Sequence, residues 1–168
     1  MPTLTLAVDG VGGNDLFTLT AGATKVIAVA APDDDDTTRI TGSVTNVQDL
    51  TFGTSALLVG SSIQAVRLIV RTRGEAVFAG TDLAKARLVV GSPGDDQSLA
   101  QDPTYVTNTF SILLDPAGNP WTKNSIDNCY CQLEVPVTGD TLTVTTVKME
   151  VDYTVGGYES RLPMMGVS

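Results

Sequence analysis

Short apolar runs alternate with clusters of glycine, proline, aspartate and asparagine along the chain. The most regular run spans 61–75, where Val66, Leu68 and Val70 fall on one face of an extended strand, because successive strand side chains point to opposite sides. Arg67 and the other polar residues of this run take the edges and the opposite face. No segment longer than about ten residues keeps an apolar period of 3.6 with a cap at each end. The pattern therefore predicts an all-β protein with little helix.

A long strand with an internal irregularity is predicted towards the C-terminus. Leu142 and Val144 alternate with polar residues, but the apolar face resumes at Val147 and Met149, one residue out of phase. One inserted residue in a strand produces such a change of phase, so a β-bulge is predicted at 145–146.

Other apolar runs complete the predicted fold. Further strands are predicted at 16–22, 25–31, 37–44, 83–92, 107–115 and 128–137, with 3–8 as one more at the start. About eight short strands are typical of an antiparallel, jelly-roll-like β-sandwich. The predicted core, contributed by both sheets, consists of Val66, Leu68, Val70, Phe110, Ile112, Leu133, Met149 and Val151.

The irregular stretch 115–128 contains structure of its own. Residues 122–128 are predicted to make a single helical turn capped by Thr122, whose hydroxyl suits an N-cap. Trp121 is the only tryptophan and lies just outside a strand. We expect its ring to cover one end of the core, with stacking on a ligand as the alternative.

The length of 168 residues fits a single domain over 1–168, with 1–15 and 158–168 as arm-like termini. No apolar run is long enough to cross a bilayer, so no membrane partner is expected. The start of the chain lacks the basic residues and cleavage site of a secretory signal, which predicts synthesis for the cytoplasm.

Charge and the absence of histidine narrow the function further. The chain has 10 Lys+Arg, 19 Asp+Glu and no His, giving a net charge of -9. Phosphate backbones are bound by basic side chains, so nucleic acid is an unsuitable partner. Without His, the chain also lacks the usual general base, every Ser–His or Cys–His pair and the commonest zinc ligand. Carboxylate pairs, as in glycoside hydrolysis, and cation sites made of oxygen ligands remain.

The carboxylates themselves do not indicate catalysis. Glu134, Asp140, Glu150 and Asp152 are candidates by residue type. Glu150 and Asp152 project from the outer face of the predicted last strand, where a solvated face explains them. Aromatic residues make up only 5% of the chain, which leaves few platforms for a sugar ring. We therefore predict no enzymatic activity, no catalytic residues and no cofactor.

Several segments, taken in order, resemble one group of proteins. They are "APDDDDTTRI", "SIQAVRLIVRTRG", "LLDPAGNPWT", "NSIDN" and the last strand "VKMEVDYTV". Together they resemble tailed-bacteriophage virion structural proteins with a jelly-roll-like β-sandwich, from Pro32 to Val155. None of these motifs is a catalytic signature, and the cysteines of "NCYCQLEV" depart from the group.

The resemblance implies a non-enzymatic virion protein made in the host bacterial cytoplasm. The first expectation is a capsid decoration or cement protein that binds the exterior of the head and stabilises the shell. Its partners would be the major capsid protein, other virion proteins and further copies of itself in a homo-oligomer. A structural protein of the neck, collar or tail is the alternative. A carbohydrate-binding module of a tail fibre or spike is the second alternative.

Four consecutive aspartates, Asp33, Asp34, Asp35 and Asp36, allow two interpretations. The resemblance implies that they form a solvated turn before an early strand. In such a turn the Asp side chains accept hydrogen bonds from backbone N–H groups. A calcium site is the alternative, because this cation takes several carboxylate and carbonyl oxygens. Four successive strand side chains cannot all point inward, so residues 94–96 would have to supply further ligands from another loop.

Cys129 and Cys131 lie two positions apart in a predicted strand and share a face, so a bond between them would strain the backbone. We predict buried free thiols, because Cys packs as a small apolar residue. If that face is exposed, a disulfide to a neighbouring subunit is the alternative. A zinc site would need two more ligands, and the chain has no His and no further Cys to provide them.

Overall fold

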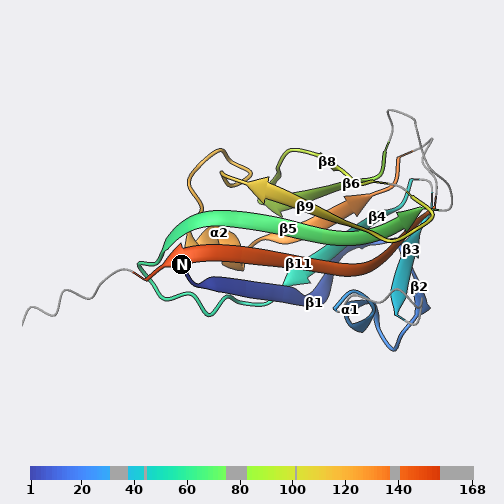
Figure 1. Cartoon of the computed structure of the whole chain (residues 1–168), viewed down its shortest axis with the longest axis horizontal. Helices are drawn as coiled ribbons and strands as arrows, with labels where there is room; N and C mark the ends of the chain where they lie inside the picture. The colour runs from blue at the N-terminus through green and yellow to red at the C-terminus, as the bar shows by residue number, and fades with distance from the viewer. Residues whose placement is uncertain (31–37, 44, 75–82, 101, 137–140, 156–168) are drawn as a thin grey trace, which may run out of the picture.

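The computed structural model describes residues 1–30, 38–43, 45–74, 83–100, 102–136 and 141–155 of the chain. Within these ranges, antiparallel strands form two layers that one long strand connects (Figure 1). The protein is an all-β, jelly-roll-like antiparallel sandwich, as the apolar pattern predicted.

One layer, here called the β5 sheet, is built around β5 and β11, which pair along their whole length. β9 pairs with the other side of β5, while β11 also pairs with the start of β1 and, further along, with β3. β2 extends this layer beyond β3. The strands are β1 (Thr3–Asp15, first part), β2 (Thr18–Ala21), β3 (Arg39–Gly42), β5 (Ser62–Gly74), β9 (Val106–Ile112) and β11 (Leu142–Thr154).

The other layer, the β10 sheet, has β10 at its centre, between β4 and β6. The second part of β1 pairs with β4, and the short strands β7 and β8 pair with the other side of β6. Figure 1 shows this layer behind β5, β11 and β1. Its further strands are β4 (Val47–Phe52), β6 (Lys85–Val90), β7 (Ser92–Pro93), β8 (Gln97–Ser98) and β10 (Tyr130–Glu134).

β1 belongs to both layers. Leu4 pairs with Val151 of β11, whereas Val11 pairs with Leu50 of β4, and the register shifts between these two halves. Strands that change sheet commonly do so at such irregularities. Gly10 sits at the shift, where a Cβ atom would lie 2.5 Å from the hydroxyl of Thr51. The prediction of an N-terminal arm over 1–15 is therefore wrong, because backbone hydrogen bonds to both sheets hold this segment. Residues 158–168 lie outside the described part.

The core lies between the two sheets, as the alternation of apolar and polar residues along the long strands predicted. Six of the eight predicted core residues are buried, and the other two, Phe110 and Ile112 of β9, are partly buried and pack against them. The predicted bulge is also present: Val144 and Thr146 of β11 pair with adjacent residues of β5, which leaves Thr145 unpaired. The bulge turns both Val144 and Val147 towards the core.

Residues 25–31 were predicted to form a strand, and this prediction is wrong for the described residues 25–30. They begin with α1 (Lys25–Ala28), which Thr24 caps by accepting a hydrogen bond from the N–H of Ile27 at 3.2 Å. Ala28 and Val29 are fully buried. The carbonyl of Val29 accepts a hydrogen bond from the N–H of Val147, between the places where β1 and β3 pair with β11. The apolar run fills a gap in the sheet edge.

The loop after β9 has the predicted structure. α2 (Lys123–Asp127) is one helical turn, and Thr122 and Ser125 form a capping box, in which each hydroxyl accepts a hydrogen bond from the backbone N–H of the other residue. Trp121 is buried against the core, and its indole N–H donates to the carbonyl of Ile112 at 3.0 Å. The ring closes one end of the sandwich, as expected.

Candidate functional site

The predicted cation site and the cysteines were the first candidates from the sequence. Asp33, Asp34, Asp35 and Asp36 lie outside the described residues. Among the residues that are described, no three His, Cys, Asp or Glu side chains are grouped so that they could hold a metal ion. Asp96, a suggested further ligand, instead forms ion pairs with Lys85 and Arg87 of β6 at 3.1 and 2.7 Å.

Cys129 and Cys131 are both buried free thiols. Burial raises the pKa of Cys129 to about 12 and that of Cys131 further still. Thiolate is the reactive form of cysteine, so neither side chain is activated. Among the described residues both cysteine side chains are buried, so these two positions lack the exposed face that an intersubunit disulfide would require.

Glu150 and Asp152 belong to a cluster of ion pairs on the outer face of the β5 sheet. Arg67 of β5 donates to both carboxylate oxygens of Asp152, at 2.7 and 3.0 Å, and its Nε lies 3.4 Å from Glu150. Hydrogen bonds from Arg67 and then Thr3 lower the pKa of Asp152 to about 2. Hydrogen bonds from Lys148 and Arg67 also lower the pKa of Glu150. Both groups stay ionised and paired at neutral pH, which suits cross-strand stabilisation and not acid catalysis.

The structure also contains a buried polar cluster that the sequence analysis missed, on β4. Asp49 is 4% exposed, yet it faces away from the core. Its Oδ2 accepts hydrogen bonds from the N–H and the side-chain amide of Asn14, both at 2.9 Å, and its Oδ1 accepts one from Gln132 at 2.8 Å. Gly12 lies so close that a Cβ atom there would be 2.7 Å from the Cβ of Asp49. The packed backbone leaves no room for a ligand on this side of the carboxylate.

From Asp49 the cluster continues across the outer face of the β10 sheet. Gln132 accepts a hydrogen bond from Arg87 at 2.8 Å, and Arg87 also forms ion pairs with Asp96 and Glu134. These residues come from neighbouring strands in register, since Gln132 pairs with Asp49 on one side and Arg87 on the other. The cluster connects three strands, and each of its charged side chains has a hydrogen-bond partner within it.

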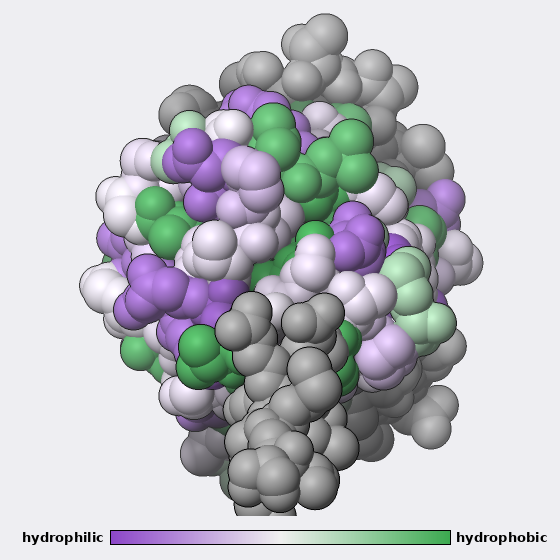
Figure 2. Space-filling view, turned by 90° about the vertical axis from the view of Figure 1, so that its left-hand side faces the viewer, coloured by the Kyte–Doolittle hydropathy of each residue, from purple (hydrophilic) through white to green (hydrophobic). Residues whose placement is uncertain are grey.

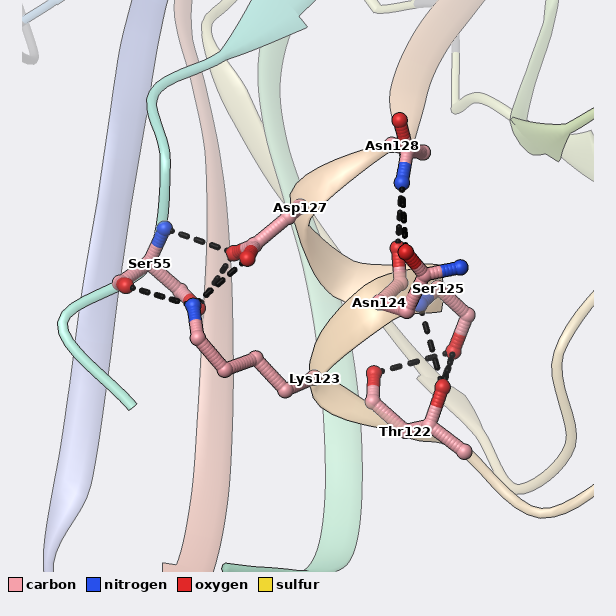
Figure 3. A network of polar contacts seen from close by, with 7 residues as sticks. All are labelled: Ser55, Thr122, Lys123, Asn124, Ser125, Asp127 and Asn128. Atoms are coloured by element: carbon pink, nitrogen blue, oxygen red, sulfur yellow. Dashed lines mark hydrogen bonds and ion pairs between the residues drawn. The ribbon is translucent and has the colours of Figure 1, made fainter. Parts of the chain in front are cut away.

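A second cluster joins α2 to the segment 53–61 between β4 and β5 (Figure 3). Lys123 lies 2.5 Å from one oxygen of Asp127 and 3.3 Å from the hydroxyl of Ser55, and the Ser55 hydroxyl donates to the other oxygen of Asp127 at 2.5 Å. A serine beside a lysine can be a nucleophile if the amine accepts its proton. Here the ammonium and the hydroxyl both donate to the carboxylate, so this arrangement holds the segment in place.

The state of Asp127 is consistent with this structural role. Burial raises the pKa of its carboxyl, but hydrogen bonds from Lys123 and from the hydroxyl and N–H of Ser55 outweigh this effect, and the pKa lies below its usual value. The ionised carboxylate of Asp127 accepts hydrogen bonds from the Lys123 side chain and the Ser55 hydroxyl, one on each oxygen.

An opening lies between the turn after β6 and the end of β9 and is called here the β9 groove. Its volume is about 500 Å³. One wall is the turn after β6, at 93–97, and the other is the chain from Ser111 to Gly118, which comprises the last two residues of β9 and those after it. The floor includes Leu88 of β6 and Ile112 of β9. The groove therefore lies between an edge of each sheet.

Hydrogen bonds fix both walls of the β9 groove. In the first wall, the N–H of Gly94 donates to the carbonyl of Leu88 at 2.9 Å, and a Cβ atom on Gly94 would meet that carbonyl oxygen at 3.0 Å. In the second wall, one oxygen of Asp115 accepts hydrogen bonds from the N–H groups of Ala117 and Asn119 at 3.0 and 2.9 Å. The shape of the groove is thus set before any ligand binds.

Exposed apolar side chains gather at one end of the molecule. The left-hand end in Figure 1 includes residues 53–61, the loop between β9 and α2, the end of β11 and the N-terminus. Figure 2 looks onto this end and shows hydrophobic residues at several places among polar ones. We call it the apolar end, and its exposed large hydrophobic residues include Met1, Leu58, Val59, Leu113, Leu114 and Val155.

No protein-family model matches the chain, and no curated protein matches it significantly. Similar solved structures include the Stig cyclase Fisc from Fischerella sp. TAU in complex with (3Z)-3-(1-methyl-2-pyrrolidinylidene)-3H-indole, at 12% identity and a TM-score of 0.46, covering 90% of this chain and 98% of that one. They also include the CBM35 from Paenibacillus barcinonensis, at 10% identity and a TM-score of 0.39, covering 93% and 100%. Likenesses this distant carry no information about what this chain binds. Within the described residues, no helix is long and apolar enough to span a membrane.

Proposed function

We infer that this chain is a non-enzymatic structural protein of a tailed-bacteriophage particle, and that it decorates the exterior of the capsid. The sequence resemblance is the first support. Its segments build neighbouring parts of one fold: "SIQAVRLIVRTRG" is the whole of β5, and "LLDPAGNPWT" follows β9 and leads into α2. Asp115 organises the turn and Trp121 covers the core. These motifs therefore encode the sandwich.

The observation that carries the proposal is the apolar end. Leu113 is 77% exposed and Val59 is 91% exposed, and both lie on segments that hydrogen bonds hold in place. Large apolar side chains that gather on a fixed surface mark an interaction site, because burying them against a partner is favourable. The major capsid protein is the proposed partner, and further copies of this chain would contact one another on the same lattice.

The polar clusters support a role without catalysis. Asp49, Asp127 and Asp152 each sit among fixed hydrogen-bond donors, and two of them form ion pairs with a lysine or an arginine. General acids and bases need a proton that can be exchanged near neutral pH, and these carboxylates are held as acceptors. The clusters stabilise the two faces and leave the end of the sandwich for binding.

Particles that lack this protein provide the test. We expect them to assemble and to lose DNA at a lower temperature than intact particles, because a protein that binds only the assembled shell stabilises that state. Purified protein should restore the resistance and saturate at a fixed ratio to capsid subunits. Deletion particles without tails, or unable to attach to cells, would instead place the protein in the neck, tail or fibre. A specific hit on a glycan array would support the carbohydrate-binding alternative.

A further inference from the structure

The β9 groove has a charge that nothing in its own walls balances. Asp95 has no hydrogen bond or ion pair through its side chain within the described part of the chain, although its neighbour Asp96 has two ion pairs. Asp115 uses one carboxylate oxygen for the backbone of its turn. No Lys or Arg lines the groove. Within the described residues, every other carboxylate accepts a hydrogen bond or forms an ion pair, so Asp95 is the carboxylate whose charge remains available for a partner.

The apolar part of the groove is as accessible as the acidic part. Leu113 and Leu114 are 77% and 49% exposed, and Leu88, Pro93 and Ile112 continue the apolar lining inward. Two carboxylates beside an aliphatic surface suit a side chain that has an aliphatic stem and a cationic head, as Lys and Arg have.

The backbone next to the groove favours an extended partner. β9 pairs with β5 on one side, and no strand pairs with its other side within the described residues. An edge strand can accept a further strand, which supplies main-chain hydrogen bonds while pockets beside it select alternate side chains. A volume of about 500 Å³ falls within the range of ligand sites, roughly 300 to 1,000 Å³.

We propose that the β9 groove binds an extended peptide segment of a partner protein, with a Lys or Arg side chain at Asp95 and Asp115 and an apolar side chain on Leu113 and Leu114. This rests on the proposed function, for which it names the chemistry of the capsid segment that the protein recognises. The walls are fixed in advance, so little ordering of this chain opposes binding.

The test is selection of a random octapeptide library on the folded, full-length protein, followed by fluorescence anisotropy with the enriched peptides. We expect enriched peptides to carry Lys or Arg next to an apolar residue, and nuclear magnetic resonance shifts upon binding to map to 93–97 and 111–118. D95N/D115N should weaken binding by about tenfold or more, because the charge-assisted contacts are lost. Asn at 115 keeps an acceptor for the turn, so folding should be unaffected.

D9N is the matched control, since Asp9 is exposed on β1 and its change alters the net charge by one unit elsewhere. The proposal is overturned if no peptide is enriched, if the enriched peptides lack basic residues, or if D95N/D115N binds them as well as D9N does. If the protein binds the peptides but particles that lack it are as heat-resistant as intact ones, the groove remains a peptide site and the capsid role is wrong. If D95N/D115N restores the heat resistance of the deletion particles as well as the original protein does, the capsid role stands but the groove is not the contact.

Discussion

At the scale of single residues, Asp49 is a buried polar group that contributes to stability. It is almost fully buried on the outer face of the β10 sheet, and it accepts hydrogen bonds from the backbone and side chain of Asn14 and from Gln132. A buried donor that loses its acceptor costs about 1–3 kcal/mol. The carboxylate therefore holds the edge strand β1 to the centre of its sheet.

Asp49→Ala should lower the free energy of unfolding by about 2–4 kcal/mol, because it leaves buried donors without an acceptor. Urea denaturation measures this change. Asp9→Ala is the control: Asp9 is exposed and accepts one hydrogen bond, from Thr51, so a change of only about 0.5 kcal/mol is expected. Equal effects of the two substitutions would contradict the role assigned to Asp49.

Asp152 predicts a particular dependence of stability on pH. Its pKa is about 2 in the folded protein, lowered by Arg67 and Thr3, against about 3.9 in an unfolded chain. A lowered folded pKa means that the carboxylate stabilises the fold above pH 4, and that this contribution is lost as the pH falls towards 2. The difference in melting temperature between the original protein and Asp152→Asn should shrink over this window. A difference that stays constant from pH 6 to pH 2 would contradict the ion pair.

The two thiols should be unreactive in the folded protein. Burial raises the pKa of Cys129 to about 12, and Cys131 is fully buried. A thiol reagent at pH 8 should label neither residue in minutes, and should label both in denaturant. Rapid labelling of the folded protein would show that one thiol is accessible, and would restore the intersubunit disulfide as a working hypothesis.

Sequence reasoning at this scale succeeded where side chains alternate and failed where polar residues are buried. Val66, Leu68 and Val70 could be assigned to the core because they share one face of the strand, while Arg67 and Arg71 lie on the other. Gln48 and Asp49 are adjacent polar residues in a central strand, and they interrupt the alternation that would have identified it. Their partners come from β1 and β10, so only the fold reveals why they are tolerated.

At the scale of elements, α2 should depend strongly on its cap. The helix has only five residues, and Thr122 and Ser125 satisfy each other's backbone N–H groups. Thr122→Ala should cost about 1 kcal/mol of stability, as the loss of an N-cap commonly does. Thr109→Ala, at an exposed position of β9, is a control that removes a threonine without removing a cap. If thermal unfolding finds the two variants equally stable, the capping box has no measurable role.

The elements that the sequence predicted correctly were those defined by local chemistry. The cap at Thr122 and the phase change near Thr145 each have a signal within a few residues. In contrast, the apolar run 25–31 has the pattern of a strand, but its described part forms α1 and a buried segment after it. The reason is that the edge of β11 has no strand partner between β1 and β3, and this segment covers it. Tertiary context decided that element. Likewise, the β9 groove depends on segments far apart in the chain, which no local pattern brings together.

At the scale of the whole molecule, the charges and the apolar residues occupy different places. Ion pairs and buried hydrogen bonds occupy the outer faces of both sheets, whereas Leu58, Val59, Leu113, Leu114 and Val155 are exposed at one end, among polar residues. This division leaves the faces stable in water and one end suited to a partner. On a capsid, many copies bound to one rigid shell would add up small contacts into a stable coat.

Binding of the protein to capsid particles tests the proposed attachment through the apolar end. Purified protein is mixed with particles that lack it, and the bound copies are counted after density-gradient sedimentation. We predict saturable binding at a fixed ratio to capsid subunits, and a loss of affinity of at least about tenfold for Leu113→Asp/Leu114→Asp, because two exposed apolar side chains would no longer be buried.

The control is Leu16→Asp, which changes an exposed leucine between β1 and β2 and should bind as the original protein does. The melting temperatures of both variants check that they are folded. Binding of Leu113→Asp/Leu114→Asp at the original affinity, or no binding of the original protein to the particles, would contradict the account.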